Sequence, residues 1–129
     1  MHNPARILIV DDNEANRDIL ATRLAAHGYQ VAEAADGEEA LAAAYQYLPD
    51  LILLDVMMPK VDGLYLARCM KSDPGLRTVP IIFLTGLSDP RDIISGIQAG
   101  ARSYLVKPFR TDELLEKVRK AVRSSVTTP

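Results

Sequence analysis

Polar residues that could do chemistry follow four of the short apolar runs in this sequence. Asp11 and Asp12 follow the first of these runs, Asp55 the second, Thr85 the third and Lys107 the fourth. Three neighbouring carboxylates repel one another and resist ionising together, and a divalent cation would relieve that repulsion. Magnesium prefers carboxylate, carbonyl and water oxygens. A lysine and a hydroxyl beside such a cation suit a phosphoryl group, because they can neutralise its oxygens and hydrogen-bond to them.

Strands and helices that would position these residues alternate along the chain. Apolar runs predict five strands, at residues 6–10, 29–34, 51–54, 79–84 and 103–106. Helical patterns predict five helices, at residues 13–27, 36–47, 63–72 and 89–100 and from 111 to about 123. This alternation favours an α/β fold with a parallel sheet covered by helices on both faces. Ligands of such sheets bind outside the carboxyl ends of the strands, where the five polar residues would meet.

Local signals add detail to the predicted helices. In the predicted helix at 13–27, apolar residues recur at intervals of about one helical turn. They predict one apolar face, formed by Ala15, Ile19, Leu20 and Leu24. The segment Asp36-Gly37-Glu38-Glu39 predicts a capping box at the start of the second helix. Asp89 and Pro90 predict the N-terminus of the fourth helix. Gly96 lies inside that helix, where glycine costs about 1 kcal/mol of helix propensity.

Length and composition limit the classes of function. The chain has 129 residues, and we expect a single domain over residues 1–129 with no output domain. Its formal net charge of −2 gives no electrostatic footprint for nucleic acid or an anionic membrane. The single cysteine, Cys69, excludes an internal disulfide and a cysteine-based zinc site, and two histidines, His2 and His27, are too few and too far apart for a metal cluster. With no secretion leader and no apolar run of membrane length, we expect a cytoplasmic protein.

Each of the polar residues also has an ordinary structural explanation. Asp12 or Asn13 could cap the first helix, and Asp55 could be a turn residue. Thr85 could be purely structural, and Lys107 could be a surface lysine. The functional hypothesis therefore depends on their convergence at one edge of the sheet.

The chain resembles the receiver domain of two-component response regulators, the family of the chemotaxis response regulator. The resemblance covers about residues 6–123 and is carried by five segments: Asp11-Asp12, Leu53-Leu54-Asp55-Val56-Met57-Met58-Pro59, Asp62-Gly63, Leu84-Thr85-Gly86 and Lys107-Pro108-Phe109. Intervals of 43, 30 and 22 residues separate Asp12, Asp55, Thr85 and Lys107, as the family would have them. The resemblance implies a flavodoxin-like (βα)5 fold with strand order 2-1-3-4-5.

The resemblance also implies a phosphorelay switch that uses magnesium. Asp55 would accept a phosphoryl group from a phosphohistidine on a histidine kinase or a histidine phosphotransfer protein. Asp12, Asp55 and the backbone carbonyl of Met57 would bind one Mg²⁺ directly, and Asp11 would act mostly through a water. The domain would catalyse only its own phosphorylation and dephosphorylation, so it would not be an enzyme acting on other substrates.

The remaining implied roles concern the response to phosphorylation. Lys107 would pair with the phosphoryl oxygens, and the Lys107–Pro108 bond would be cis. Thr85 would turn inward to bond the phosphate, and Tyr104 would follow it from an outward to an inward rotamer. The surface formed by the predicted elements at 89–100, 103–106 and 111–123 would change and control a downstream effector protein.

Some residues depart from the family pattern or tune it. Gly86 stands where alanine is more frequent. The segment Gly100-Ala101-Arg102-Ser103-Tyr104 lacks the paired aspartates of the DNA-binding subfamily, so we expect a monomer or weak homodimer. The balanced charge predicts no direct contact with nucleic acid. Met57 and Leu87 follow Asp55 and Thr85 by two residues. The resemblance implies that side chains at these two positions border the path of the hydrolytic water. Neither methionine nor leucine can orient a water, which predicts a long-lived phosphoaspartate.

Three alternatives compete with a free-standing switch. The chain could be a receiver excised from a larger regulator, a hybrid kinase or a cyclase. A magnesium-dependent phosphatase with an aspartate nucleophile would need a second aspartate where Met57 stands, because methionine cannot transfer protons. A flavodoxin-like cofactor binder would need a Ser-, Thr- and Gly-rich loop at residues 11–14, where this chain is acidic.

Overall fold

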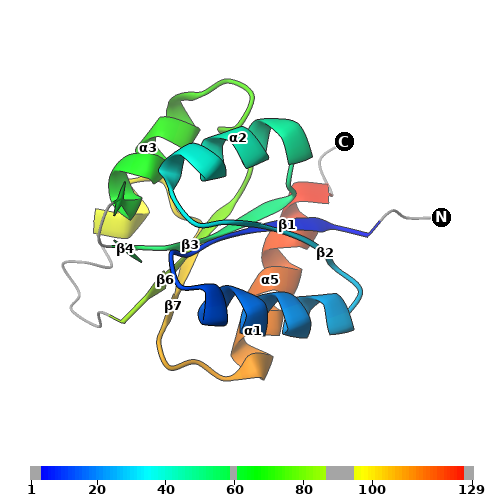
Figure 1. Cartoon of the computed structure of the whole chain (residues 1–129). Helices are drawn as coiled ribbons and strands as arrows, with labels where there is room; N and C mark the ends of the chain where they lie inside the picture. The colour runs from blue at the N-terminus through cyan, green and yellow to red at the C-terminus, as the bar shows by residue number, and fades with distance from the viewer. Residues whose placement is uncertain (1–3, 59–60, 87–94, 127–129) are drawn as a thin grey trace.

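A five-stranded parallel sheet forms the centre of the molecule. The computed structural model describes residues 4–58, 61–86 and 95–126 (Figure 1). The strands of the sheet are β1 (Arg6–Val10), β2 (Gln30–Ala34), β3 (Leu51–Asp55), β6 (Ile81–Thr85) and β7 (Ser103–Val106). They lie in the order β2-β1-β3-β6-β7. Counted along the chain this is the predicted order 2-1-3-4-5, which is confirmed.

Helices cover both faces of this sheet. They are α1 (Glu14–Ala26), α2 (Gly37–Tyr47), α3 (Gly63–Ser72) and α5 (Thr111–Val126), and residues 95–98 are also helical. On one face, Leu8 and Val10 of β1 pack in a core with residues of α2 and α3. On the other face, Ile7 and Ile9 pack in a core with residues of α1 and α5. Side chains alternate along a strand, so the four apolar residues 7–10 of β1 serve both cores.

Two helix starts follow from the predicted caps. The Asn13 side chain accepts a hydrogen bond from the backbone N–H of Asn16 at 2.9 Å, and Asn13 is the N-cap of α1. The Asp36 carboxylate accepts one from the N–H of Glu39 at 2.8 Å at the start of α2. Each bond satisfies a backbone donor that the helix itself leaves unpaired. The predicted start of the fourth helix at Asp89 lies outside the described residues.

The prediction that Ala15 and Ile19 share the buried face of α1 is wrong. Leu20 and Leu24 are buried, whereas Ala15 is exposed and Ile19 is 51% exposed. Neighbouring positions on a helix differ by about 100°, so a narrow buried stripe through residues 20 and 24 leaves Ile19 on its flank.

A short antiparallel pair of strands, β4 (Met57–Met58) and β5 (Val61–Asp62), was also not predicted. It follows directly after the end of β3.

Gly96 packs against the ring of Phe83 in β6. A Cβ added at Gly96 would lie 2.6 Å from Phe83 Cδ2 and 2.9 Å from Cε2. We therefore expect Gly96→Ala to lower the free energy of unfolding, because overpacking costs about 1–3 kcal/mol. Alanine recovers only about 1 kcal/mol of helix propensity. Urea unfolding measures the difference, and Gly86→Ala is the control, because nothing lies within 4 Å of its added Cβ. A stabilised Gly96→Ala protein would contradict this packing argument.

Both ends of the described chain lie on the side of the sheet away from the carboxyl ends of the strands (Figure 1). In Figure 1, β1 begins and α5 ends at the right of the view, whereas β1 and β3 run toward the left. All strands of the main sheet are parallel, so their carboxyl ends share one edge. The predicted acidic residues Asp11, Asp12 and Asp55 lie at this edge.

Candidate functional site

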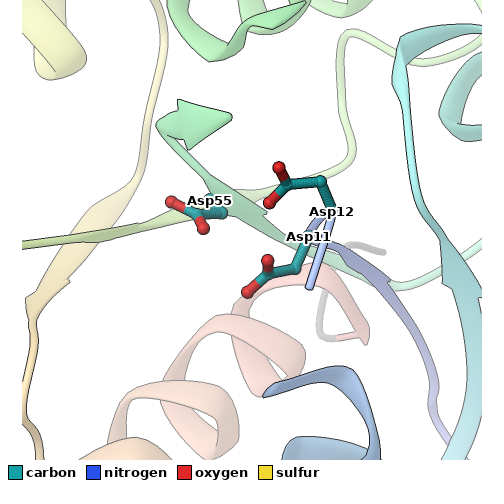
Figure 2. A group of neighbouring side chains, drawn as sticks. All are labelled: Asp11, Asp12 and Asp55. Carbon is teal, nitrogen blue, oxygen red and sulfur yellow. The ribbon is translucent and has the colours of Figure 1, made fainter. Parts of the chain in front are cut away.

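Three aspartates meet at the carboxyl edge of the sheet. Asp11 and Asp12 follow β1, and Asp55 ends the neighbouring strand β3 (Figure 2). One carboxylate oxygen from each of the three lies within 4.8 Å of the others. Asp11 is fully buried and Asp55 is 4% exposed, whereas Asp12 is exposed. The predicted acidic cluster is therefore present, with one side open to solvent.

Lys107 brings a positive charge to the buried pair of carboxylates. Its Nζ lies 3.2 Å from Asp55 Oδ2 and 3.8 Å from Asp11 Oδ2. Its backbone N–H donates to the carbonyl of Thr85 at 2.7 Å, which ties the end of β7 to the end of β6. The Lys107–Pro108 peptide bond is cis, as the family resemblance implied.

Asp11 is held on one oxygen only. Its Oδ1 accepts a hydrogen bond from the backbone N–H of Asn13 at 2.9 Å. Its Oδ2 is buried and has no hydrogen-bond partner within the described part of the chain. An oxygen so placed is unfavourable unless a cation, a water or a proton satisfies it.

This arrangement fits a magnesium ion. The donor set consists of carboxylate oxygens, which Mg²⁺ prefers, and includes the unsatisfied Oδ2 of Asp11. The exposed Asp12 leaves room for the water ligands that Mg²⁺ usually keeps. Met57, whose backbone carbonyl the resemblance adds to the set, begins β4 two residues after Asp55.

Burial is the main reason why the pKa of Asp11 is raised above its ordinary value of 3.8. The negative charges of Asp55 and Asp12 raise this pKa further. The N–H of Asn13 and the ammonium of Lys107 lower it, but they do not cancel the effect of burial. The ionised form of Asp11 is therefore disfavoured in the metal-free protein.

We expect Asp11→Asn to stabilise the metal-free protein at neutral pH. Between the unfolded pKa near 3.8 and the raised folded pKa, the folded state binds more protons than the unfolded state. The wild-type free energy of unfolding therefore falls as pH rises through this window, whereas asparagine does not titrate. Urea unfolding in a chelator at several pH values measures the difference. The excess free energy of unfolding of Asp11→Asn over the wild type should shrink below pH 3.8. An excess that does not change with pH would contradict this account.

Thr85 and Tyr104 lie on adjacent strands beside this cluster. Thr85 ends β6, is 6% exposed and pairs with Val106 of β7. Tyr104 is half-buried and pairs with Phe83. Lys117 Nζ lies 5.6 Å from the centre of the Tyr104 ring and donates to Ser103 Oγ at 3.0 Å. Leu87, which sequence reasoning associated with the phosphoryl lifetime, lies outside the described residues.

Two residues of the site were not singled out from the sequence. Arg17 Nη1 donates to the backbone carbonyl of Asp11 at 2.6 Å. Gly63 allows α3 to approach the end of β3, because its Cβ would lie 2.9 Å from Val56 Cα and 3.0 Å from the carbonyl oxygen of Asp55. Gly63 belonged to a quoted motif but had no role assigned, and an arginine on a helix gives no signal of a backbone contact.

A groove of about 310 Å³ opens beside the cluster. Its lining includes the charged residues Asp11 and Lys107 and the apolar residues Ile19, Pro108 and Phe109. The exposed side chain of Ile19 is therefore part of a partly apolar approach to the charged site. Among the described residues, no helix has the length and apolar character needed to span a membrane.

Comparisons with known proteins agree with this geometry. The family model of the response regulator receiver domain matches residues 7–119. Response regulator PleD of Caulobacter vibrioides is 46% identical over 119 residues, which are 92% of this chain and 26% of that protein. The DNA-binding dual master transcriptional regulator RpaA of Synechocystis is 41% identical over 124 residues, 96% of this chain and 52% of that protein. The chain thus spans about a quarter and about half of these relatives.

A solved structure supports the same assignment. The chemotaxis protein CheY4 of Vibrio cholerae superposes with a TM-score of 0.87 at 35% identity, covering 92% of this chain and 98% of that one. The fold, the acidic cluster and the match over most of the sequence agree, and the chain belongs to the response regulator receiver domain family.

Proposed function

We propose that this receiver domain accepts a phosphoryl group on Asp55 and passes the signal on by a change of surface. The observation that carries the proposal is the position of Lys107 Nζ, 3.2 Å from Asp55 Oδ2, in a cluster with Asp11 and Asp12. Of the three carboxylates, Asp55 is the one that ends a central strand and contacts this ammonium closely.

Magnesium would bind to Asp12, Asp55 and the carbonyl of Met57, with Asp11 acting mostly through a water. When bound, the ion neutralises charge on the transferring phosphoryl group. Asp55 supplies the attacking oxygen, and Lys107 stabilises the negative charge on the phosphoryl oxygens. Thr85 would donate its hydroxyl hydrogen to one of those oxygens after transfer.

The donor would be a phosphohistidine on a histidine kinase or a histidine phosphotransfer protein. An Asp55 carboxylate oxygen forms the new bond to phosphorus while the bond from phosphorus to the imidazole nitrogen breaks. The electron pair of the broken bond stays on the imidazole. The Asp55 carboxylate oxygen acts as the nucleophile, and Lys107 Nζ, 3.2 Å from Asp55 Oδ2, lies where it can also bind the incoming phosphoryl oxygens.

Output would pass through Thr85 and Tyr104 to the surface of β7 and α5. Lys117 contacts the Tyr104 ring, so an inward movement of the ring would remove this contact. Lys117 also lines a pocket of about 270 Å³ with Arg102 and Lys120. A change at Tyr104 would therefore alter a positively charged surface that a downstream effector protein could recognise. The DNA binding stated in the name of RpaA is a property of that longer protein.

Incubation with acetyl phosphate and Mg²⁺, followed by intact mass measurement, tests the proposed function. We expect a mass increase of one phosphoryl group that requires Mg²⁺ and is removed by hydroxylamine, which cleaves acyl phosphates. Continuous release of phosphate without a detectable adduct would instead favour an aspartate-based phosphatase. The absence of both adduct and release would contradict the proposal.

A further inference from the structure

Arg17 connects the loop that carries the acidic pair to the edge strand β2. Its Nη1 donates to the carbonyl oxygen of Asp11 at 2.6 Å, and its Nε donates to Glu33 Oε1 of β2 at 3.2 Å. The Arg17 side chain is only 15% exposed, whereas that of Glu33 is 37% exposed. Two bonds from one planar guanidinium hold this side chain in a single orientation.

The carbonyl that Arg17 holds belongs to the peptide joining Asp11 to Asp12. A peptide unit is planar, so fixing its oxygen also fixes the direction in which the chain enters Asp12. The preceding peptide is fixed as well, because the N–H of Asp11 donates to the carbonyl of Ala34 at 3.1 Å. The main chain on both sides of Asp11 is thus bonded to β2, directly or through Arg17.

Asp12 depends on this main-chain support more than its neighbours do. The Asp11 carboxylate is held by the N–H of Asn13, and the Asp55 carboxylate is held by Lys107. The carboxylate of Asp12 is exposed, and no hydrogen bond or ion pair to it is present among the described residues. Its position relative to the other two carboxylates is therefore set by its backbone.

We propose that Arg17 is a positioning residue for the magnesium site. It holds the Asp11–Asp12 peptide so that the Asp12 carboxylate faces Asp55, and Glu33 holds the guanidinium in place. This inference rests on the proposed function, because it assigns Asp12 as a direct magnesium ligand.

The direction in which Mg²⁺ affinity changes when Arg17 is replaced separates a positioning role from a purely electrostatic one. Arg17 carries a positive charge close to a site for a divalent cation. If the charge alone mattered, its removal would tighten Mg²⁺ binding, because like charges repel. If positioning matters, removal loosens Mg²⁺ binding despite the loss of this repulsion.

The test measures Mg²⁺ affinity by titration calorimetry for the wild type, Arg17→Met and Arg17→Lys. We expect Arg17→Met to weaken binding by about tenfold, the size usual for groups that orient metal ligands. Arg17→Lys keeps the charge but cannot reproduce the two-point contact, so we expect it to weaken binding as well. Unchanged or tighter binding by Arg17→Met, or wild-type affinity for Arg17→Lys, would overturn the proposal.

Arg6→Met is the matched control. Arg6 lies at the opposite end of β1, and its Nη1 also donates to a backbone carbonyl, that of Tyr47 at 2.9 Å. This variant should keep wild-type Mg²⁺ affinity, whatever its effect on urea unfolding in a chelator. If Arg17→Met does not fold, the charge-conserving Arg17→Lys decides the question. A wild type that binds no Mg²⁺ would overturn the proposed magnesium site itself, which distinguishes that failure from a failure of Arg17.

Discussion

Asp55→Asn is expected to take up no phosphoryl group from acetyl phosphate in the presence of Mg²⁺. Asparagine keeps the shape of the side chain but lacks the carboxylate oxygen that would attack phosphorus. The fold should survive, because the substitution removes one of three repelling carboxylates and leaves the apolar part of β3 unchanged. Intact mass measurement over time, together with circular dichroism, checks both parts of this expectation.

Asp50→Asn is the control for this variant. Asp50 precedes β3 at the opposite end from Asp55, and its Oδ2 accepts a hydrogen bond from the N–H of Arg6. We expect it to take up the phosphoryl group at the wild-type rate. Wild-type uptake by Asp55→Asn would mean that the acceptor is a different residue.

Asp12→Ala is expected to reduce Mg²⁺ affinity by at least tenfold without lowering the stability of the metal-free protein. Asp12 is exposed and lies near two other carboxylates. Removing a metal ligand should weaken binding at least as much as removing a group that only orients one. Removing a like charge relieves repulsion, so the free energy of unfolding in a chelator should stay the same or rise.

Thermal unfolding with and without Mg²⁺ measures both effects. The rise in melting temperature caused by Mg²⁺ should be lost in Asp12→Ala at ion concentrations that stabilise the wild type. Asp18→Ala, which removes an exposed carboxylate from α1, should keep the full rise. A rise that persists in Asp12→Ala would show that Asp12 is not a ligand.

The parts of the fold that were predictable are those set by local pattern and strand direction. The run at residues 6–10 is apolar at nearly every position, which indicates a buried parallel strand, and β1 covers that range. Parallel strands bring their carboxyl ends to one edge, so Asp55 and Lys107 could be placed together although 52 residues separate them. The acidic cluster and its lysine follow from this rule and the residue types.

The parts that were missed depend on contacts that leave no pattern in the sequence. Every residue has a backbone carbonyl, so nothing marks that of Asp11 as the partner of Arg17. The close approach at Gly63 depends on where α3 crosses the end of β3. The exposure of Ile19 depends on the width of the buried stripe of α1, which helical spacing alone does not define. Each of these features is set by the packing of elements against one another.

The position of the two chain ends has a consequence for modular architecture. β1 begins and α5 ends on the side of the sheet away from Asp55 (Figure 1). A unit attached at either end would therefore leave the approach to Asp55, the proposed acceptor, open, and the same receiver could be combined with many different attachments. The relatives PleD and RpaA, of which this chain spans 26% and 52%, fit such reuse of one module. If phosphorylation of Asp55 changes the surface as proposed, a unit attached at either end would sense that change only through surfaces that extend from one edge of the sheet to the other, such as the outer face of α5.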